Sequence, residues 1–364
     1  MLDAAAFRSE FPVLERIAYL NAGSNGPAPR AAVEAAAADL RLQLEAGRGD
    51  HAFFEQRLLR PAEELRGRVA SMLGCSPEEL ALTGSTTGGV NALLAALELG
   101  PGDEVLTSDE EHPGVLAPLA AGRARRGFEV RVVPFAHLAG EVRPRTRLVA
   151  ASHVSWITGR VADVAALRAA GAPVLLDGAQ ALGAVPVDVR DLGCEFYAAS
   201  GQKWLCGPIG AGYLFARAER VPDLLPTAAG YQSLADAARP LELTLHEGAR
   251  RLDAGPMSSH DLSWALVALD VLERPGLAAV QERASGLAAL LAGRLAELGL
   301  EVAPRGDSTL VSWRAEDPEA EAARLGDEGI VVRFLPGRPW VRASVGGWSS
   351  EEELERLATS TSSR

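Results

Sequence analysis

Lysine is almost absent from this sequence. Of the 36 basic residues in the 364-residue chain, 35 are arginine and one, Lys203, is lysine. Either residue serves for solubility and salt bridges, but only a lysine amine can lose its proton when desolvated and then attack a carbonyl carbon. A lone lysine is most often a solvated surface residue. The surroundings of Lys203 therefore decide whether it has a chemical role.

Cysteine, long apolar runs and nucleotide-binding motifs are also scarce. The three cysteines (Cys75, Cys194 and Cys206) form no CxxC pair and are too few for a disulfide framework. No apolar run approaches the roughly 20 residues of a membrane span, and no signal-peptide pattern is visible. The net charge of -12 disfavours nucleic acid or an anionic membrane as a partner. We expect a cytoplasmic protein whose partners are small molecules and its own copies.

Apolar runs alternate with helical patterns between about Leu80 and Ala216, which is typical of an α/β protein. The runs predict buried strands of a mainly parallel, mixed sheet of seven strands, and ligands bind such sheets at the carboxyl ends of the strands. We predict a large α/β domain over residues 16–260 and a smaller α+β domain over residues 261–364 together with 1–15. The seven runs are LALT, EVLTS, EVRVVPF, RLVAASHV, PVLLD, CEFYAAS and GAGYLFA.

The segment LALTGSTTGGVNALLAAL predicts a strand, a loop of small residues and a helix. This arrangement places Ser85, Thr86 and Thr87, with free backbone N–H groups, at a helix N-terminus, which is a favourable place for an anion. The segment matches neither the Walker pattern nor GxGxxG, so a nucleoside triphosphate or a dinucleotide has little support. A phosphate loop and a glycine-rich turn without a ligand stay equally open from this segment alone.

Asp177 ends the apolar run PVLLD, and Gln180 follows three residues later. A buried carboxylate at the end of a strand needs a cationic partner. The protonated ring nitrogen of pyridoxal phosphate (PLP) would be such a partner, because an aspartate keeps that nitrogen protonated and makes the ring an electron sink. Gln180 could then reach the phenolic oxygen. The alternative is that Asp177 caps the N-terminus of a helix, and the residues alone do not decide between the two.

Lys203 follows the next apolar run, CEFYAAS, in the segment SGQKW. It therefore lies at the same edge of the sheet as Asp177. It would form the internal aldimine with PLP, pass the cofactor to the amine of the substrate, and then move the Cα proton as a free amine. Ser200 and Gln202 could flank the phosphate group. Together with the loop and Asp177, these residues predict one site with complementary roles.

Two further residues complete the predicted site. His112, after the strand EVLTS, could lie flat over the cofactor ring, and the alternative is a surface histidine beside acids. Arg342, in the run WVRAS, is a candidate to bind the carboxylate of the substrate through two parallel hydrogen bonds. Arginine is so frequent in this chain that Arg342 by itself indicates little.

With these residues identified, the chain resembles the class V aminotransferase family of fold-type I PLP enzymes, a group that includes cysteine desulfurases and isopenicillin N epimerase-like proteins. The resemblance implies the fold-type I architecture and a homodimer with sites at the subunit interface. The segments that carry it, nearly from end to end, are YLNAGSNGPAPRAAVEA, TGSTTGGVN, EEHPG, SHVSW, DGAQALG, SGQKWLCGPIGAG, RLDAGP and VRASVGGWSSEEELERL.

The resemblance also implies a role for each matching residue. Asn21 and Trp156 are expected near the substrate, together with Arg342. His112 is expected on the cofactor ring, and the loop of Ser85, Thr86 and Thr87 at the phosphate group. The remaining implied roles are Asp177 at the pyridine nitrogen, Gln180 at O3′, Lys203 as the Schiff-base lysine, and Ser200 with Gln202 at the phosphate group.

Several positions depart from the family pattern. Gln202 stands where histidine is common, and Trp156 stands where desulfurases carry asparagine. Pro256 replaces the threonine that usually reaches the phosphate group of the neighbouring subunit, which leaves Ser258 or Ser259 as substitutes. The segment FLPGRPW has no cysteine, so the persulfide mechanism of the desulfurases has little support. Cys206 is expected to pack beneath the loop of Lys203 rather than to act as a nucleophile.

The sequence therefore predicts a homodimeric PLP enzyme that acts on an α-amino acid and uses no metal. Transamination and β-elimination that splits a C–S bond without an enzyme persulfide are equally favoured. Epimerisation, cysteine desulfuration and a non-catalytic binding protein stay as alternatives. A NAD-dependent oxidoreductase would need a GxGxxG motif that opens a helix after an early strand, and none is present.

Overall fold

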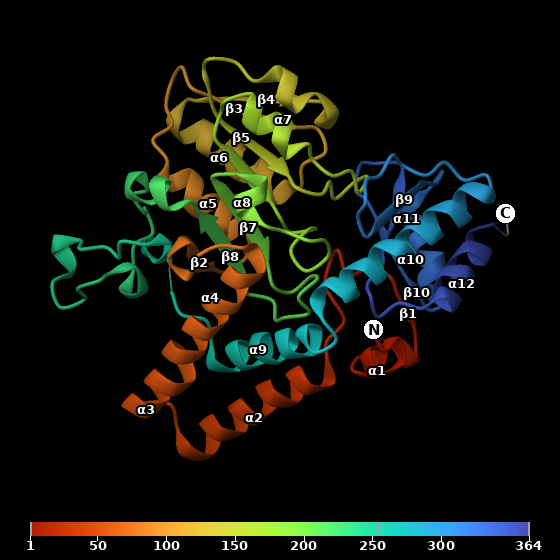
Figure 1. Ribbon diagram of the computed structural model, residues 1–364, viewed down its shortest axis with the longest axis horizontal. Coiled ribbons are helices and arrows are strands. Elements are labelled where there is room, and N and C mark those ends of the chain that lie inside the picture. Colours follow the sequence, from red (N-terminus) through yellow and green to blue (C-terminus); the bar gives the residue numbers. More distant parts are fainter. Residues whose placement is uncertain (1, 254, 363–364) are drawn as a thin grey trace.

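A seven-stranded sheet lies at the centre of the molecule (Figure 1), and the computed structural model describes residues 2–253 and 255–362. The strand order is β2-β8-β7-β6-β5-β3-β4, and neighbouring strands are parallel except where β8 pairs with β2 and β7. The predicted mainly parallel, mixed sheet of an α/β protein is confirmed. The strands are β2 (Leu80–Thr83), β3 (Glu104–Ser108), β4 (Glu129–Val133), β5 (Thr146–Ser152), β6 (Val174–Asp177), β7 (Phe196–Ser200) and β8 (Gly212–Ala216).

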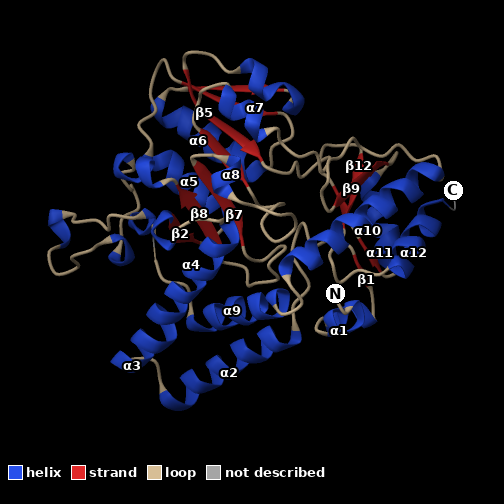
Figure 2. Ribbon diagram, viewed as in Figure 1, coloured by secondary structure: helices blue, strands red, loops and turns tan. Residues whose placement is uncertain are grey.

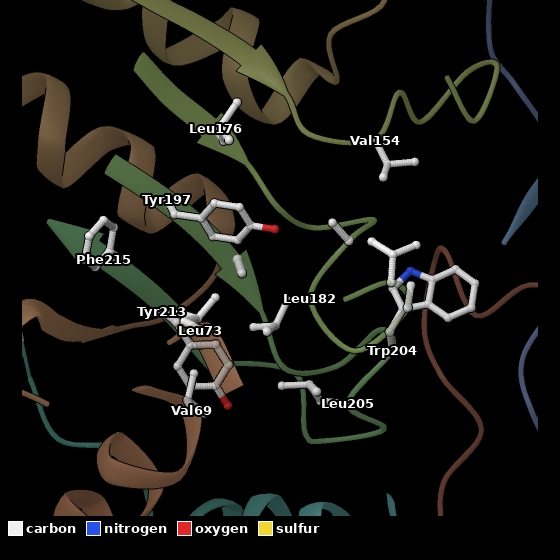
Figure 3. Close-up of a cluster of buried hydrophobic side chains, with 14 of the residues drawn as sticks. Val69, Leu73, Val154, Leu176, Leu182, Tyr197, Trp204, Leu205, Tyr213 and Phe215 are labelled. Carbon is white, nitrogen blue, oxygen red and sulfur yellow. The ribbon is translucent and has the colours of Figure 1, made fainter. Parts of the chain in front are cut away.

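Alternate residues along each strand enter different hydrophobic clusters, as the pleat of a strand requires. Tyr213 and Phe215 of β8 belong to the cluster on one face, whereas Leu214 belongs to the cluster on the other. Because both faces are covered, the strands read as continuous apolar runs. Figure 3 shows part of the first cluster, with strand residues Leu176, Tyr197, Tyr213 and Phe215 and the α4 residues Val69 and Leu73.

Helices cover both faces of the sheet (Figure 2). Side chains of α4 and α9 join the first cluster, and those of α5 and α6 join the second. Helix α2 lies alongside α9 (Figure 1). The helices are α1 (Ala4–Ser9), α2 (Arg30–Ala46), α3 (His51–Phe53), a π-helical turn (Phe54–Leu59), α4 (Arg60–Leu73), α5 (Thr86–Ala96), α6 (Pro113–Arg126), α7 (Val164–Ala169), α8 (Val189–Leu192), α9 (Ser259–Glu273), α10 (Leu277–Glu297), α11 (Pro318–Asp327) and α12 (Glu351–Ser362).

The C-terminal part of the chain builds two smaller sheets with a hydrophobic cluster of their own. The antiparallel order β11-β12-β9 forms one sheet, and β1 pairs in parallel with β10 to form the other. Their cluster joins Ala18 and Leu20 to residues between 287 and 358. The expected domain boundaries at residues 15/16 and 260/261 stay a prediction. The strands are β1 (Ala18–Tyr19), β9 (Leu310–Arg314), β10 (Ile330–Val331), β11 (Arg333–Phe334) and β12 (Trp340–Ser344).

Local signals set the start of the two helices that follow β2 and β3. Ser85 precedes α5, and its Oγ accepts a hydrogen bond of 2.9 Å from the amide of Gly88, as an N-cap residue does. Helix α6 begins with Pro113 at its first position after His112, whose Nδ1 accepts from the amide of Gly114 at 2.9 Å. Both N-termini consequently lie at the carboxyl edge of the sheet.

A buried ion pair fastens the edge strand β2. Arg66 of α4 and Asp253 approach to 2.7 Å, and both side chains are buried. The guanidinium of Arg66 also donates to the carbonyl of Leu80 at 2.6 Å, and Asp253 Oδ1 accepts from the amide of Leu82 at 2.8 Å. The pair therefore satisfies backbone groups of an edge strand that leads directly into the loop before α5.

Neither a membrane-spanning helix nor a group of side chains that could hold a metal ion is found in the described part of the chain. None of its helices combines the length and the apolar character that crossing a membrane requires. No group of three or more histidine, cysteine, aspartate or glutamate side chains among these residues is placed to hold a metal ion.

Candidate active site

A cavity of about 250 Å³ lies at the carboxyl edge of the large sheet. The cavity is lined by the loops after β2, β3, β5, β6 and β7 and by the strands β11 and β12 of the smaller sheet. The structure thus brings together nearly all the residues that the sequence singled out. The lining consists of Gly23, Ser24, Asn25, Ser85, Thr86, Thr87, His112, Gly114, Trp156, Asp177, Ala179, Gln180, Ser200, Gln202, Lys203, Arg333 and Arg342.

A second cavity, of about 750 Å³, lies at the opposite edge of the sheet. The starts of β5 and β7 line it, together with the segment that contains Arg220 and Asp223. It contains neither lysine nor histidine, and its charged residues are of both signs. The smaller cavity is therefore the one with the groups needed for catalysis.

The opposite charges of Lys203 and Asp177 act on each other in the small cavity. Burial lowers the pKa of the Lys203 amine to about 8, and the positive charges of Arg342 and Arg333 act in the same direction, while Asp177 opposes the shift. Burial raises the pKa of the Asp177 carboxyl, while Lys203 and the amide of Ala179 oppose that shift. An amine with a depressed pKa is a nucleophile and a base near neutral pH.

The backbone of the Lys203 loop is held from outside the sheet. The amide of Gly26 donates to the carbonyl of Gln202 at 2.8 Å, and the indole of Trp264 donates to the carbonyl of Cys206 at 3.0 Å. A Cβ atom at residue 26 would lie 2.1 Å from the carbonyl oxygen of Lys203, so only glycine permits this approach. The amine is consequently presented by a loop with several fixed points.

Hydroxyl groups and backbone amides gather at the N-terminus of α5. The Oγ of Ser200 accepts from the amide of Thr86 at 3.1 Å and also bonds the Thr86 hydroxyl. Ser85 and Thr87 line the same part of the cavity. Gln202 extends nearby, and its buried Oε1 has no hydrogen-bond partner within the described residues. This end of the cavity is suited to a phosphate group, because it combines a helix N-terminus with several donors.

Both ends of the Gln180 amide are engaged by the protein. Its Nε2 donates to the carbonyl of Gly23 at 2.8 Å, and its Oε1 accepts from the indole of Trp204 at 3.2 Å. No sequence pattern assigns a role to Trp204. In the structure its ring is buried in the core cluster beside the cavity (Figure 3), and its N–H orients a predicted cofactor-binding residue.

His112 is neutral in its surroundings. Burial lowers its pKa to about 4, and the positive charges of Lys203, Arg333 and Arg342 contribute in the same direction. Because Nδ1 accepts from the amide of Gly114, the ring proton is on Nε2. The ring of Trp156 meets it edge-on, with centroids 4.9 Å apart and an interplanar angle of 82°. The uncharged ring of His112 therefore lines the cavity, and His112 is not a surface histidine.

Two arginines line the side of the cavity that faces the smaller sheet. Arg342 is buried, and one Nη donates to the carbonyl of Trp156 at 2.6 Å while its Nε has no partner within the described residues. Arg333 lies opposite Arg342 in the β11–β12 register. Burial and the charge of Arg333 lower the pKa of Arg342 to about 9. Neither guanidinium forms an ion pair with an acid among the described residues, so the two groups together constitute a site for anions.

The sequence did not indicate Arg333, and it assigned Asn21 to the substrate. In the structure Arg333 Nη1 donates to Ser24 Oγ at 3.0 Å, and that hydroxyl donates to Asn21 Oδ1 at 2.8 Å. Asn21 does not line the cavity; it lies at the end of this chain of hydrogen bonds. Its contribution is therefore to orient Ser24, which in turn orients Arg333.

The remaining candidate residues have partners inside the molecule. Cys206 is buried, and burial raises the pKa of its thiol, so it has no nucleophilic thiolate. Ser258 caps α9 through the amide of Asp261, and Ser259 donates to the buried Asp39 at 2.6 Å. Neither serine is free in the subunit to bind a phosphate group. Pro256 lines a separate small cavity beside Arg66 and Asp253.

Comparisons with known proteins agree with this arrangement. The family model described as aminotransferase class-V matches residues 18–357. A cysteine desulfurase of Klebsiella pneumoniae (strain 342) is 33% identical over 96% of this chain and 95% of that protein. An isopenicillin N epimerase of Streptomyces clavuligerus is 31% identical over 94% of this chain and 93% of that protein. The solved complex between the cystine C-S lyase C-DES and its product cysteine persulfide has a TM-score of 0.91, is 28% identical, and covers 97% of this chain and 99% of that chain.

Proposed function

Because the chain belongs to the class V aminotransferase family, whose cofactor is PLP, we propose that it is a C–S β-lyase for an amino acid that carries two carboxylates. The observation that supports this most is the pairing of Arg333 with Arg342 beside Lys203 in a cavity lined by no cysteine. Its relatives include cysteine desulfurases as well as a C-S lyase, so the finer activity is our inference.

The residues of the cavity fit PLP. The buried Asp177 suits a protonated ring nitrogen, and the amine of Lys203 suits the aldehyde carbon. The backbone amides and hydroxyl groups around the N-terminus of α5 form the end rich in donors that a phosphate group requires. Bound PLP supplies an electron sink for negative charge that develops at the Cα atom of the substrate.

The protein's own groups divide the remaining work. Arg342 binds the α-carboxylate and so fixes the Cα–H bond relative to the amine of Lys203. That amine, with its pKa of about 8, takes the Cα proton. The neutral ring of His112 and the indole of Trp156 cover the cavity without adding a charge. Loss of the Cα proton allows the β-sulfur substituent to leave with the electron pair of the C–S bond.

The absence of a cysteine near Arg333 favours a lyase over a desulfurase. The residues between Arg333 and Arg342 contain none, and the three cysteines of the chain lie elsewhere, two of them buried. No thiolate is therefore placed to accept sulfur from the substrate. In a β-elimination the sulfur leaves with its own substituent, and water releases the remaining three carbons as pyruvate and ammonia.

A panel of substrates tests the proposed reaction. We expect L-cystine to give pyruvate, ammonia and a persulfide in equal amounts, and single-carboxylate thioether amino acids to react more slowly. Accumulation of pyridoxamine phosphate with a keto acid product would instead indicate an aminotransferase. Recovery of the D-amino acid without pyruvate would indicate an epimerase. Either of these two results would overturn the lyase assignment.

Arg333 is expected to select substrates with a second carboxylate. Replacing Arg333 by alanine removes one charge-assisted hydrogen bond, so we expect kcat/KM for L-cystine to fall by roughly 10- to 100-fold. The kcat/KM for a substrate with one carboxylate should change by less than about threefold. Steady-state kinetics on both substrates measure this split, and Arg338→Ala, at a guanidinium that donates to the carbonyl of Asp109, is the control. An equal loss on both substrates would contradict the selective role.

We further propose that two copies of the chain associate through the segment 225–247. This segment projects from the body of the molecule at the left of Figure 1. Several of its apolar side chains are exposed. The exposed fraction is 61% for Leu225, 67% for Tyr231 and 100% for Leu241. An apolar patch of this kind is typical of an interface. A second copy is the occupant that the family resemblance leads us to expect.

Replacement of Leu241 by aspartate tests the dimer. The wild-type protein should elute with twice the 38.2 kDa mass of one chain, and the variant should dissociate about tenfold more readily or more. Light scattering behind a sizing column measures the mass. The control is Leu290→Asp on α10, which exchanges another half-exposed leucine for a charge. Wild-type protein of monomer mass at micromolar concentration would exclude the dimer.

A further inference from the structure

Glu111 is a buried acid that the proposed reaction does not use. It lies between β3 and α6, immediately before His112, and its exposed fraction is 2%. Its two carboxyl oxygens contact two serine hydroxyls, Ser108 Oγ at 2.5 Å and Ser152 Oγ at 2.6 Å. These serines end β3 and β5, so the side chain of Glu111 joins the carboxyl ends of two neighbouring strands. No arginine or lysine among the described residues forms an ion pair with it.

Asp177 is the charged group on the neighbouring strand β6 that acts on Glu111. Ser152 and Asp177 are partners in the register of β5 and β6, and the charge of Asp177 acts on Glu111. The other titratable groups nearby are engaged elsewhere. Glu110 accepts from Ser155 and Thr158, the Nδ1 of His112 accepts from Gly114, and His153 bonds the hydroxyl of Tyr197.

Two buried carboxyl groups with one cationic partner cannot both be charged at low cost. The positive charge of Lys203 acts on Asp177. Glu111, in contrast, has no ion-pair partner among the described residues and accepts hydrogen bonds from the hydroxyls of Ser108 and Ser152 and from the backbone of Ser152. Burial raises the pKa of Glu111 to about 7; the serine hydroxyls oppose the shift and the charge of Asp177 adds to it.

We propose that Glu111 is a positioning residue for the ring end of the cofactor: its buried carboxyl joins β3 to β5 beside Asp177, and it carries no charge there once the pH falls below neutral. This inference rests on the proposed cofactor site for its functional meaning. The raised pKa of Glu111 itself follows from its burial and from the charge of Asp177, which are properties of the chain alone. Its test can therefore be separated from that of the proposed function.

Unfolding of the full-length protein at two pH values tests the neutral state of Glu111. The folded-state pKa lies above the ordinary value of 4.5, so the folded protein keeps a proton that the unfolded chain releases between those values. The wild-type protein therefore loses the corresponding stability as the pH rises through this window. The Glu111→Gln variant has no carboxyl group at this position, so it does not lose that stability. The folding equilibrium constant of Glu111→Gln relative to wild type should therefore increase by about 50-fold between pH 5 and pH 8.

The control variant is Glu110→Gln, which removes the same charge one residue away. Glu110 is only half-buried, and we expect the equilibrium constant of its variant relative to wild type to change less between the two pH values than that of Glu111→Gln. A ratio for Glu111→Gln that is the same at pH 5 and pH 8 would overturn the proposal. If the wild-type protein takes up no PLP, the proposed function fails, while this comparison still reports the proton on Glu111.

A second measurement separates positioning from packing alone. Glu111→Leu leaves the hydroxyls of Ser108 and Ser152 without their partner, so we expect the dissociation constant for PLP, measured by fluorescence titration, to rise by about tenfold. Glu111→Gln restores both contacts without a charge and should stay within about twofold of wild type. Equal PLP affinity of the leucine variant and the wild type would show that Glu111 positions nothing at this site.

Discussion

Replacing Lys203 by alanine is expected to lower kcat by about 10⁴-fold or more. The chain has no other lysine, so no neighbouring amine can take its place. The variant loses the group that attaches the cofactor and the group that takes the Cα proton, because one amine does both in the proposed reaction. Steady-state release of pyruvate from L-cystine, or of the product that the substrate panel identifies, measures the loss. A variant that keeps more than about 1% of the wild-type kcat would contradict the role of Lys203.

Lys203→Arg is the matched control for charge. It keeps a cation beside Asp177, but a guanidinium does not lose its proton in the way that the Lys203 amine does. We expect the same loss of kcat as for alanine, with the fold intact by circular dichroism. Substantial activity in the arginine variant would mean that the site needs a positive charge rather than an amine.

Replacing Asp253 by alanine is expected to lower the free energy of unfolding by about 3–5 kcal/mol. The substitution leaves Arg66 buried and charged without its partner, and it also removes the acceptor of the Leu82 amide. Strand β2 is held on one side only by β8, and it leads to the loop of Ser85 and Thr86. Urea unfolding measures the free energy, and PLP affinity should fall with it.

Two further variants are compared with Asp253→Ala in the same unfolding measurement. In Arg66→Met combined with Asp253→Leu both charges are gone, so the loss should be smaller than in Asp253→Ala. Glu355→Ala breaks an exposed ion pair with Arg294 and should lower the free energy of unfolding far less than Asp253→Ala. If Asp253→Ala were as mild as Glu355→Ala, the ion pair would not be what fastens β2.

The strands of the sheet and much of the cavity lining could be predicted because they depend on the order of the apolar runs along the chain. Runs such as PVLLD and CEFYAAS are continuous and apolar, since both faces of their strands are covered. In a parallel sheet the residues after each run meet at one edge. The positions of Asp177 and Lys203 in one cavity follow from that rule, without knowledge of any side-chain contact.

The sequence did not reveal what depends on tertiary neighbours. Arg333 is one of 35 arginines, and only the β11–β12 register sets it opposite Arg342 beside the cavity. In the sequence Glu111 is one of three consecutive acids. Its burial becomes visible only in the structure, where the ends of β3 and β5 enclose it. Asn21 was expected at the substrate because of the family resemblance, but Ser24 intervenes between it and Arg333.

Borohydride reduction of the purified protein tests the central claim most directly. The protein should be yellow, the visible absorption should vanish on reduction, and digestion should give a single pyridoxyl-labelled peptide that contains Lys203. Because the chain has one lysine, a labelled side-chain amine can only be that residue. Protein that takes up no PLP, or that carries no label on the Lys203 peptide after reduction, would contradict the assignment of this cavity as a PLP site.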